Sequence, residues 1–220
     1  MPAKRAQSVL AGGKGLSDDR KAELEAANGL RQYDEGIQII QMYLEPDRPF
    51  ALRPTLLRHL QKIAVEGLEP DAGEFRTTPI KISKSAHAPP GPHLVKSLVQ
   101  EMCDYVNDNL HVSTPFHLAA YVMWRINWIH PFSEGNGRTS RIVSYIILNV
   151  KLGYLLPGIP SIPQQIQQDR SAYFRALEQA DEADRIDDLD VSAMEEALKG
   201  MLATQLLSVI EAADGGAQVI

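Results

Sequence analysis

A polar loop with one histidine carries the residues best suited to chemistry. It reads His130-Pro-Phe-Ser-Glu-Gly-Asn-Gly-Arg-Thr-Ser-Arg141 and lies between two strongly apolar segments. The proline at 131 predicts that the preceding helix ends here and that His130 has extended backbone geometry. Gly135 and Gly137 leave backbone N–H groups bare at the start of the next helix, where the helix dipole favours an anion, above all a phosphate. The loop therefore predicts a histidine beside an anion site.

Charged side chains extend this anion site. Arg138 and Arg141 are three residues apart and share one helical face, which suits several phosphate groups. Glu134 supplies the hard carboxylate that Mg²⁺ binds together with phosphate oxygens. An imidazole with an ordinary pKa of about 6.5 is mostly neutral near pH 7 and can accept a proton from a hydroxyl. The pattern indicates nucleotide phosphate chemistry with His130 as the candidate general base.

The segments around the loop predict a mostly helical fold. Apolar residues recur at helical spacing, and caps, glycines and prolines bound the segments. Asn28-Gly29 is expected to separate the first two helices. From Phe75, β-branched and polar residues alternate around Pro79, which predicts a short edge hairpin. Trp124 and Trp128 are expected in the core. The expected helices are 17–28, 30–44, 54–67, 94–109, 114–129, 137–152, 164–180 and 191–212.

Composition excludes several classes of protein. The formal charge of −6 over 220 residues argues against nucleic acid or an anionic membrane as the main partner. The longest uncharged apolar stretch, 142–150, is about half of a membrane span. The single cysteine, Cys103, excludes an intramolecular disulfide and fits a reducing compartment. A cytoplasmic location is therefore expected.

The loop resembles the signature HPFx[D/E]GNGRxxR of the Fic family at every defined position. The similarity extends outward from the loop, over roughly 30–180. Phe75-Arg-Thr-Thr and His87-Ala-Pro-Pro resemble the two edges of the Fic flap hairpin, and Arg170-Ser-Ala-Tyr-Phe resembles the segment beside the nucleotide base. The resemblance implies an all-α, Fic-like core with one small β-hairpin flap, which transfers AMP from ATP to a protein hydroxyl.

The resemblance also implies a role for each site residue. His130 is the general base and Glu134 binds Mg²⁺. The flap docks the target protein by adding a strand to its edge. The residues implied to contact ATP are Gly135, Asn136, Gly137, Arg138, Arg141, Tyr173, Phe174 and Asp181, and those implied to contact the target are Thr77, Thr78, Pro79 and Ile80.

The chain divides into four expected regions. A flexible tail at 1–16 precedes the N-terminal helices at 17–53. The Fic core spans 54–185, with the flap hairpin at 75–88 and the catalytic loop at 130–138. A C-terminal helix and tail occupy 186–220. The apolar stripe of that last helix is expected to dock on the core, with a dimer seam as the alternative.

Two other activities remain open at this stage. The same loop could serve removal of AMP from a modified protein, or transfer of another phosphate-linked group. A non-catalytic nucleotide-binding or interaction module is the third reading, but the intact His130 argues against it, since pure binding needs no neutral base.

The family resemblance also implies that a glutamate of the chain could inhibit the site. Many Fic proteins carry [S/T]xxxE[G/N] on a helix whose glutamate pairs with the second arginine of the signature. Glu25, on the expected inhibitory helix at 17–28, lacks the flanking residues of that motif. Glu196 follows Ser192 at the right spacing, but Ala197 comes after it. Glu25 is favoured because its helix directly precedes the Fic-like region. A homo-oligomer and a separate inhibitory partner both remain open.

Overall fold

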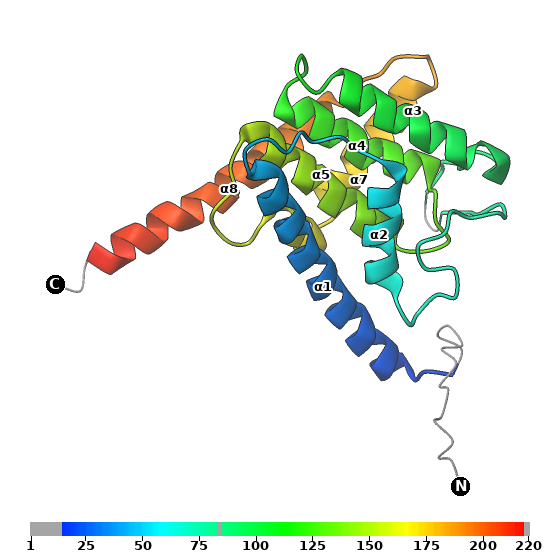
Figure 1. Cartoon of the computed structure of the whole chain (residues 1–220), viewed down its shortest axis with the longest axis horizontal. Helices are drawn as coiled ribbons and strands as arrows, with labels where there is room; N and C mark the ends of the chain where they lie inside the picture. Colours follow the sequence, from blue (N-terminus) through cyan, green and yellow to red (C-terminus); the bar gives the residue numbers. More distant parts are fainter. Residues whose placement is uncertain (1–14, 83–84, 218–220) are drawn as a thin grey trace, which may run out of the picture.

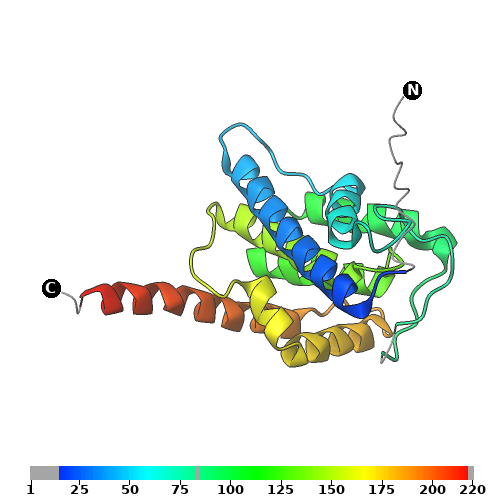
Figure 2. The ribbon, with the colours of Figure 1, turned by 90° about the horizontal axis from the view of Figure 1, so that it is seen from below.

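A computed structural model describes residues 15–82 and 85–217 of the chain. These residues form eight α-helices and one short 3₁₀ helix. Figures 1 and 2 show the helices gathered around two central ones, with the C-terminal helix projecting from one side. The helices are α1 (Asp18–Leu44), α2 (Pro54–Val65), η1 (Pro92–Leu94), α3 (Val95–Asp108), α4 (Pro115–Ile129), α5 (Asn136–Leu152), α6 (Ile162–Gln168), α7 (Ser171–Asp184) and α8 (Ser192–Ala217).

The two central helices, α4 and α5, flank the polar loop and pack against each other. α4 begins as its sequence predicts, because the Thr114 hydroxyl accepts a hydrogen bond from the His117 N–H at 3.0 Å and proline occupies its first position. α5 ends at Gly153, whose φ of 80° suits a left-handed cap. Both helices are buried along most of their length. The loop between them is therefore held at both ends by the core.

The first helix is one continuous rod, so the expected break at Asn28-Gly29 is wrong. The buried Asn28 side chain donates to the Glu66 carbonyl at 2.9 Å, and this tertiary contact replaces the turn that the dipeptide usually makes. Further along α1, a Cβ on Gly36 would lie 2.4 Å from Ile142 Cδ1. The glycine at this position lets α1 cross closely over α5.

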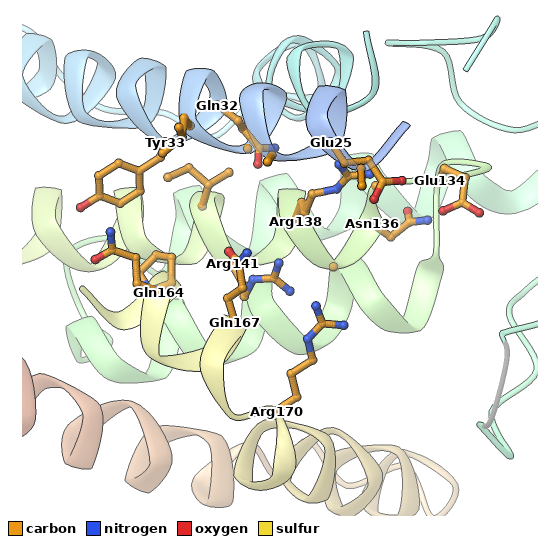
Figure 3. A pocket seen from close by; sticks show the side chains of 18 of the residues that line it. Glu25, Gln32, Tyr33, Glu134, Asn136, Arg138, Arg141, Gln164, Gln167 and Arg170 are labelled. Carbon is orange, nitrogen blue, oxygen red and sulfur yellow. The ribbon is translucent and has the colours of Figure 1, made fainter. Parts of the chain in front are cut away.

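The expected helix over 164–180 is two helices, α6 and α7. The chain turns at Asp169, whose carboxylate accepts from the N–H of Ser171, the first residue of α7, at 2.8 Å. α7 then continues to Asp184, past the expected end. The turn brings Arg170 toward the N-terminus of α5, as Figure 3 shows.

The flap carries no strand in its described residues, 75–82 and 85–88. The segment is an out-and-back excursion, visible beside α2 in Figure 1, rather than a paired hairpin. Pro79 has no N–H to give to a ladder. Instead, the segment is held by hydrogen bonds from Arg76 and by the His87 ring, which lies 2.8 Å from the Trp128 carbonyl.

The last helix docks on the core mainly through its first half. Met194 and Leu198 are buried, and the buried amide of Gln205 donates to the Tyr145 hydroxyl at 3.1 Å. Beyond this point Leu207 and Ile210 are more than half exposed. None of the described helices combines the length and the apolar character that crossing a bilayer requires. Of the expected tail at 1–16, residues 1–14 lie outside the described residues.

Candidate active site

A cavity of about 760 Å³ opens between α1, the start of α5 and α6. Figure 3 shows polar side chains from all three helices directed into it. The polar loop forms one end, and α6 with Tyr33 forms the other. The lining residues are Ala22, Glu25, Ala26, Gly29, Leu30, Gln32, Tyr33, His130, Glu134, Gly135, Asn136, Gly137, Arg138, Arg141, Ile142, Pro163, Gln164, Gln167 and Arg170.

His130 is the cap residue at the end of α4 and has left-handed backbone, with φ 50° and ψ 59°. The prediction of extended geometry is therefore wrong. Its N–H still donates to the Ile126 carbonyl at 2.9 Å, so the helix turns sharply before Pro131. The ring Nδ1 lies 3.2 Å from the Asn127 carbonyl, which can only accept. This contact favours the tautomer with the proton on Nδ1 and leaves Nε2 as an acceptor.

The electrostatic surroundings keep this imidazole neutral. Burial lowers the pKa of His130 to about 4, and the nearby charge of Arg76 lowers it further, whereas the hydrogen bond to the Asn127 carbonyl raises it. The ring is therefore unprotonated at neutral pH, as a proton acceptor must be.

Asn136 organises the loop. Its side chain accepts from the Phe132 N–H at 3.0 Å and donates to the Phe132 carbonyl at 2.8 Å. Phe132 is fully buried and contacts Phe75, with ring centroids 5.3 Å apart. Gly135 has φ 82°, and a Cβ there would lie 2.9 Å from Val65 Cγ1. The loop is thus a closed turn that places Gly135, Asn136 and Gly137, at the N-terminus of α5, along the cavity.

Three guanidinium groups, those of Arg138, Arg141 and Arg170, lie around the start of α5. Arg138 donates to the Ala64 carbonyl at 2.9 Å, while Arg141 is 9% exposed. Burial lowers the pKa of Arg141, and the charges of Arg170 and Arg138 lower it further. In residues 15–82 and 85–217, no carboxylate forms a salt bridge with any of the three. Clustered cations without counterions favour a polyanionic ligand.

Two carboxylates also line the cavity. Glu25 reaches from α1 toward Arg138 and Asn136, as Figure 3 shows. Glu134 is exposed, and its carbonyl accepts from the Gln61 amide at 2.9 Å. Among the described residues, no cluster of three His, Cys, Asp or Glu side chains could hold a metal by itself. Glu134 could bind Mg²⁺ only together with ligand oxygens and water.

The sequence of the chain is similar to that of known proteins. The profile of the Fic/DOC family matches residues 51–148, which include the whole polar loop. This chain carries a Fic/DOC domain. A protein named Protein adenylyltransferase Fic from Drosophila willistoni is 36% identical over 115 residues, which are 52% of this chain and 21% of that protein. Its counterpart from Drosophila grimshawi is 31% identical over 156 residues, which are 68% of this chain and 30% of that protein. The chain spans less than a third of either relative.

Solved structures support the fold of the Fic/DOC domain. A Fic domain containing signaling protein from Bacteroides thetaiotaomicron has a TM-score of 0.67 at 20% identity, covering 86% of this chain and 73% of that chain. Fic-1 from C. elegans, residues 134–508, has a TM-score of 0.67 at 19% identity, covering 94% of this chain and 61% of that chain. The all-α fold predicted from the sequence is confirmed.

The Fic/DOC domain brings the predicted loop residues together in one cavity, but not the three predicted adenosine contacts. Tyr173 is buried, with its hydroxyl 3.4 Å from that of Ser140. Asp181 accepts from the Trp124 indole at 2.9 Å, and Phe174 is half exposed. None of these three lines the cavity. Their contact with adenosine stays a prediction.

Some residues around the Fic/DOC site escaped the sequence reasoning. Tyr33, Gln164 and Gln167 line the cavity from helices with no motif of their own. Arg76 was expected only as part of the flap, but its side chain contacts the catalytic loop at the His130 carbonyl. The flap residues Thr77, Thr78 and Pro79 are exposed, and Ile80 is partly buried.

Proposed function

We propose that this chain is a protein adenylyltransferase, which transfers AMP from ATP to the hydroxyl of a Ser, Thr or Tyr side chain on another protein. One observation carries the proposal. A neutral histidine whose Nε2 can accept a proton shares a cavity with a helix N-terminus and three guanidinium groups that form no salt bridge within residues 15–82 and 85–217. A proton acceptor next to a polyphosphate site is what nucleophilic attack on a nucleotide requires.

The reaction conserves atoms and charge as follows. The target oxygen attacks the α-phosphorus of ATP, and its proton passes to His130 Nε2. The new oxygen–phosphorus bond forms as the bond between the α-phosphorus and the bridging oxygen breaks, and pyrophosphate leaves. The N–H groups at Gly135 and Gly137 stabilise the α-phosphate, while Arg138 and Arg141 hold the β- and γ-phosphates. Asn136 contributes by fixing the loop.

Mg²⁺ fits this arrangement as a partner of ATP. Glu134 would hold it with phosphate oxygens, because the carboxylate is exposed at the cavity and engages in no described salt bridge. When bound, the ion neutralises charge on the phosphates. The exposed residues Thr77, Thr78 and Pro79, with Ile80, offer the docking edge for the target protein.

We further propose that Glu25 restrains the enzyme. It projects into the cavity from α1, whereas Glu196 lies on α8 and pairs with Lys199 at 2.6 Å. A carboxylate near the arginine cluster competes with the γ-phosphate for the same cations. Movement of Glu25 out of the cavity would release the site.

The decisive experiment uses ATP labelled at the α- or the γ-phosphate, with the purified chain and a cell extract. Label retained on protein only from the α position supports AMP transfer, and His130→Ala should abolish it. His59→Ala is the matched control, because His59 contacts Glu35 on the surface, away from the cavity. Retention of the γ label, or release of AMP from a previously modified protein, would replace this proposal with kinase-like transfer or AMP removal.

A further inference from the structure

A buried arginine outside the cavity is bonded entirely to backbone. Arg76 is 4% exposed, and its guanidinium donates to four carbonyl oxygens and to no carboxylate among the described residues. The acceptors are His130 at 2.7 Å, Ile129 at 3.2 Å, Pro90 at 2.6 Å and Thr78 at 3.1 Å. An arginine buried this way gives up solvation for hydrogen bonds alone. Because the loss of solvation costs free energy, such an arrangement indicates that the backbone geometry fixed by Arg76 has a function.

The four carbonyls belong to two different parts of the site. Ile129 and His130 form the junction between α4 and the catalytic loop. Thr78 and Pro90 lie on the outgoing and returning arms of the flap. The backbone of Arg76 adds a fifth link, since its N–H donates to the Pro131 carbonyl at 2.9 Å. One residue therefore joins both arms of the flap to the base.

The junction that Arg76 holds is strained. His130 has φ 50°, a left-handed conformation that is uncommon outside glycine, although histidine adopts it more readily than most residues. Such a conformation persists only where the surrounding structure over-determines it. Two of the four bonds from Arg76 end on the carbonyls on either side of the His130 nitrogen, so they fix the direction in which the imidazole leaves the backbone.

We propose that Arg76 is a positioning residue for His130, which holds the base in its left-handed conformation and couples it to the flap that docks the target. This inference rests on the proposed transferase function. Displacement of either flap arm would pull on the bonds to Thr78 or Pro90 and so shift the guanidinium that holds His130. A correctly seated target would therefore keep the base aligned.

The charge of Arg76 also supports His130 as a base, because it favours the neutral form of the imidazole. Alongside burial, its positive charge lowers the pKa of His130, and His87 on the returning arm adds a second contribution. Burial in turn lowers the pKa of Arg76. A guanidinium stays protonated in proteins, so its charge is permanent.

The test compares Arg76→Lys with Arg58→Lys. Lysine keeps the charge but cannot span four carbonyls with one ammonium group. Arg58 is a matched control, because it also bonds a backbone carbonyl, that of Gly73 at 2.7 Å, and contacts Phe75, yet touches no loop residue. We expect Arg76→Lys to lower kcat about 100-fold, the cost of a misplaced catalytic group, while the Kd for ATP changes less than about twofold, since no bond from Arg76 reaches the arginine cluster.

Two further measurements test the positioning role, one with a different variant of Arg76 and one that needs no AMP transfer. In Arg76→Ala, millimolar guanidinium should restore kcat and methylammonium should not. Imidazole ¹⁵N spectra of His130 need no activity, and they should show loss of the Nδ1–H tautomer in Arg76→Lys but not in Arg58→Lys. A kcat within threefold of the unmodified chain, or unchanged His130 spectra in folded Arg76→Lys, would overturn the positioning role. An inactive chain with altered His130 spectra would instead overturn only the transferase proposal.

Discussion

Protonation of His130 should couple to the stability of the fold, with a sign that the structure sets. The pKa of this group is lowered from 6.5 to about 4 in the folded protein, chiefly by burial. Below pH 6.5 the unfolded chain therefore binds a proton that the folded chain does not, and the free energy of unfolding falls as the pH falls. The slope is about 1.4 kcal/mol per pH unit, so between pH 6.5 and 4 the loss from His130 alone approaches about 3 kcal/mol.

Urea unfolding from pH 7.5 to 4.5 measures this loss when the chain is compared with His130→Asn. Asparagine is suited to the left-handed conformation at this position and carries no titrating group. The difference in stability should be constant above pH 7, and below pH 6.5 the unmodified chain should lose stability relative to His130→Asn. Parallel stability curves over the whole range would show that His130 titrates normally, and would refute the reasoning that burial keeps the base neutral.

The remaining predictions concern the cavity. Arg141→Ala should weaken ATP binding by about 1.5–3 kcal/mol, the value of a charge-assisted hydrogen bond, measured by calorimetry; unchanged affinity would remove Arg141 from the phosphate site. Glu25→Gly should raise AMP transfer about twofold to fivefold, as expected if an exposed carboxylate stops competing weakly with the γ-phosphate for the arginine cluster, while Glu196→Gly should not; equal effects would exclude Glu25 as the restraint. Gly135→Ala should lower the melting temperature, because left-handed backbone costs alanine about 1–2 kcal/mol and its Cβ would lie 2.9 Å from Val65 Cγ1; Gly29→Ala, with open space around its Cβ, should not lower it.

The predictable parts of this protein were the local ones. The residues of the loop from His130 to Arg141 are contiguous in the sequence. Its place between two core helices and at a helix N-terminus could therefore be predicted from sequence. The same holds for Thr114 as a cap, whose partner lies three residues away.

The parts that escaped prediction depend on contacts between distant residues. Asn28 looked like a helix break because its partner, the Glu66 carbonyl, is 38 residues away. Arg76 looked like part of a strand because its carbonyl partner on His130 is 54 residues away. Asp169 is different, since its bond to Ser171 is local, and an aspartate two residues before a serine could have indicated the turn that precedes α7.

Because α1 crosses closely over α5, a small tilt of α1 at the crossing moves the exposed N-terminal end of this helix. Its C-terminal half is anchored by buried residues, among them Ile39 and Ile40, while most of the first ten residues of the helix are exposed. Gly36 sits at the crossing, and Glu25 lies eleven residues further out, about 16 Å along the helix axis. A tilt of about 5° at the crossing would move Glu25 by about 1.4 Å, half the length of a hydrogen bond. A larger side chain at position 36 would therefore push α1 away from α5 and change the width of the cavity between them, against the restraint that Asn28 and Gln32 exert through their bonds to the Glu66 and Leu60 carbonyls.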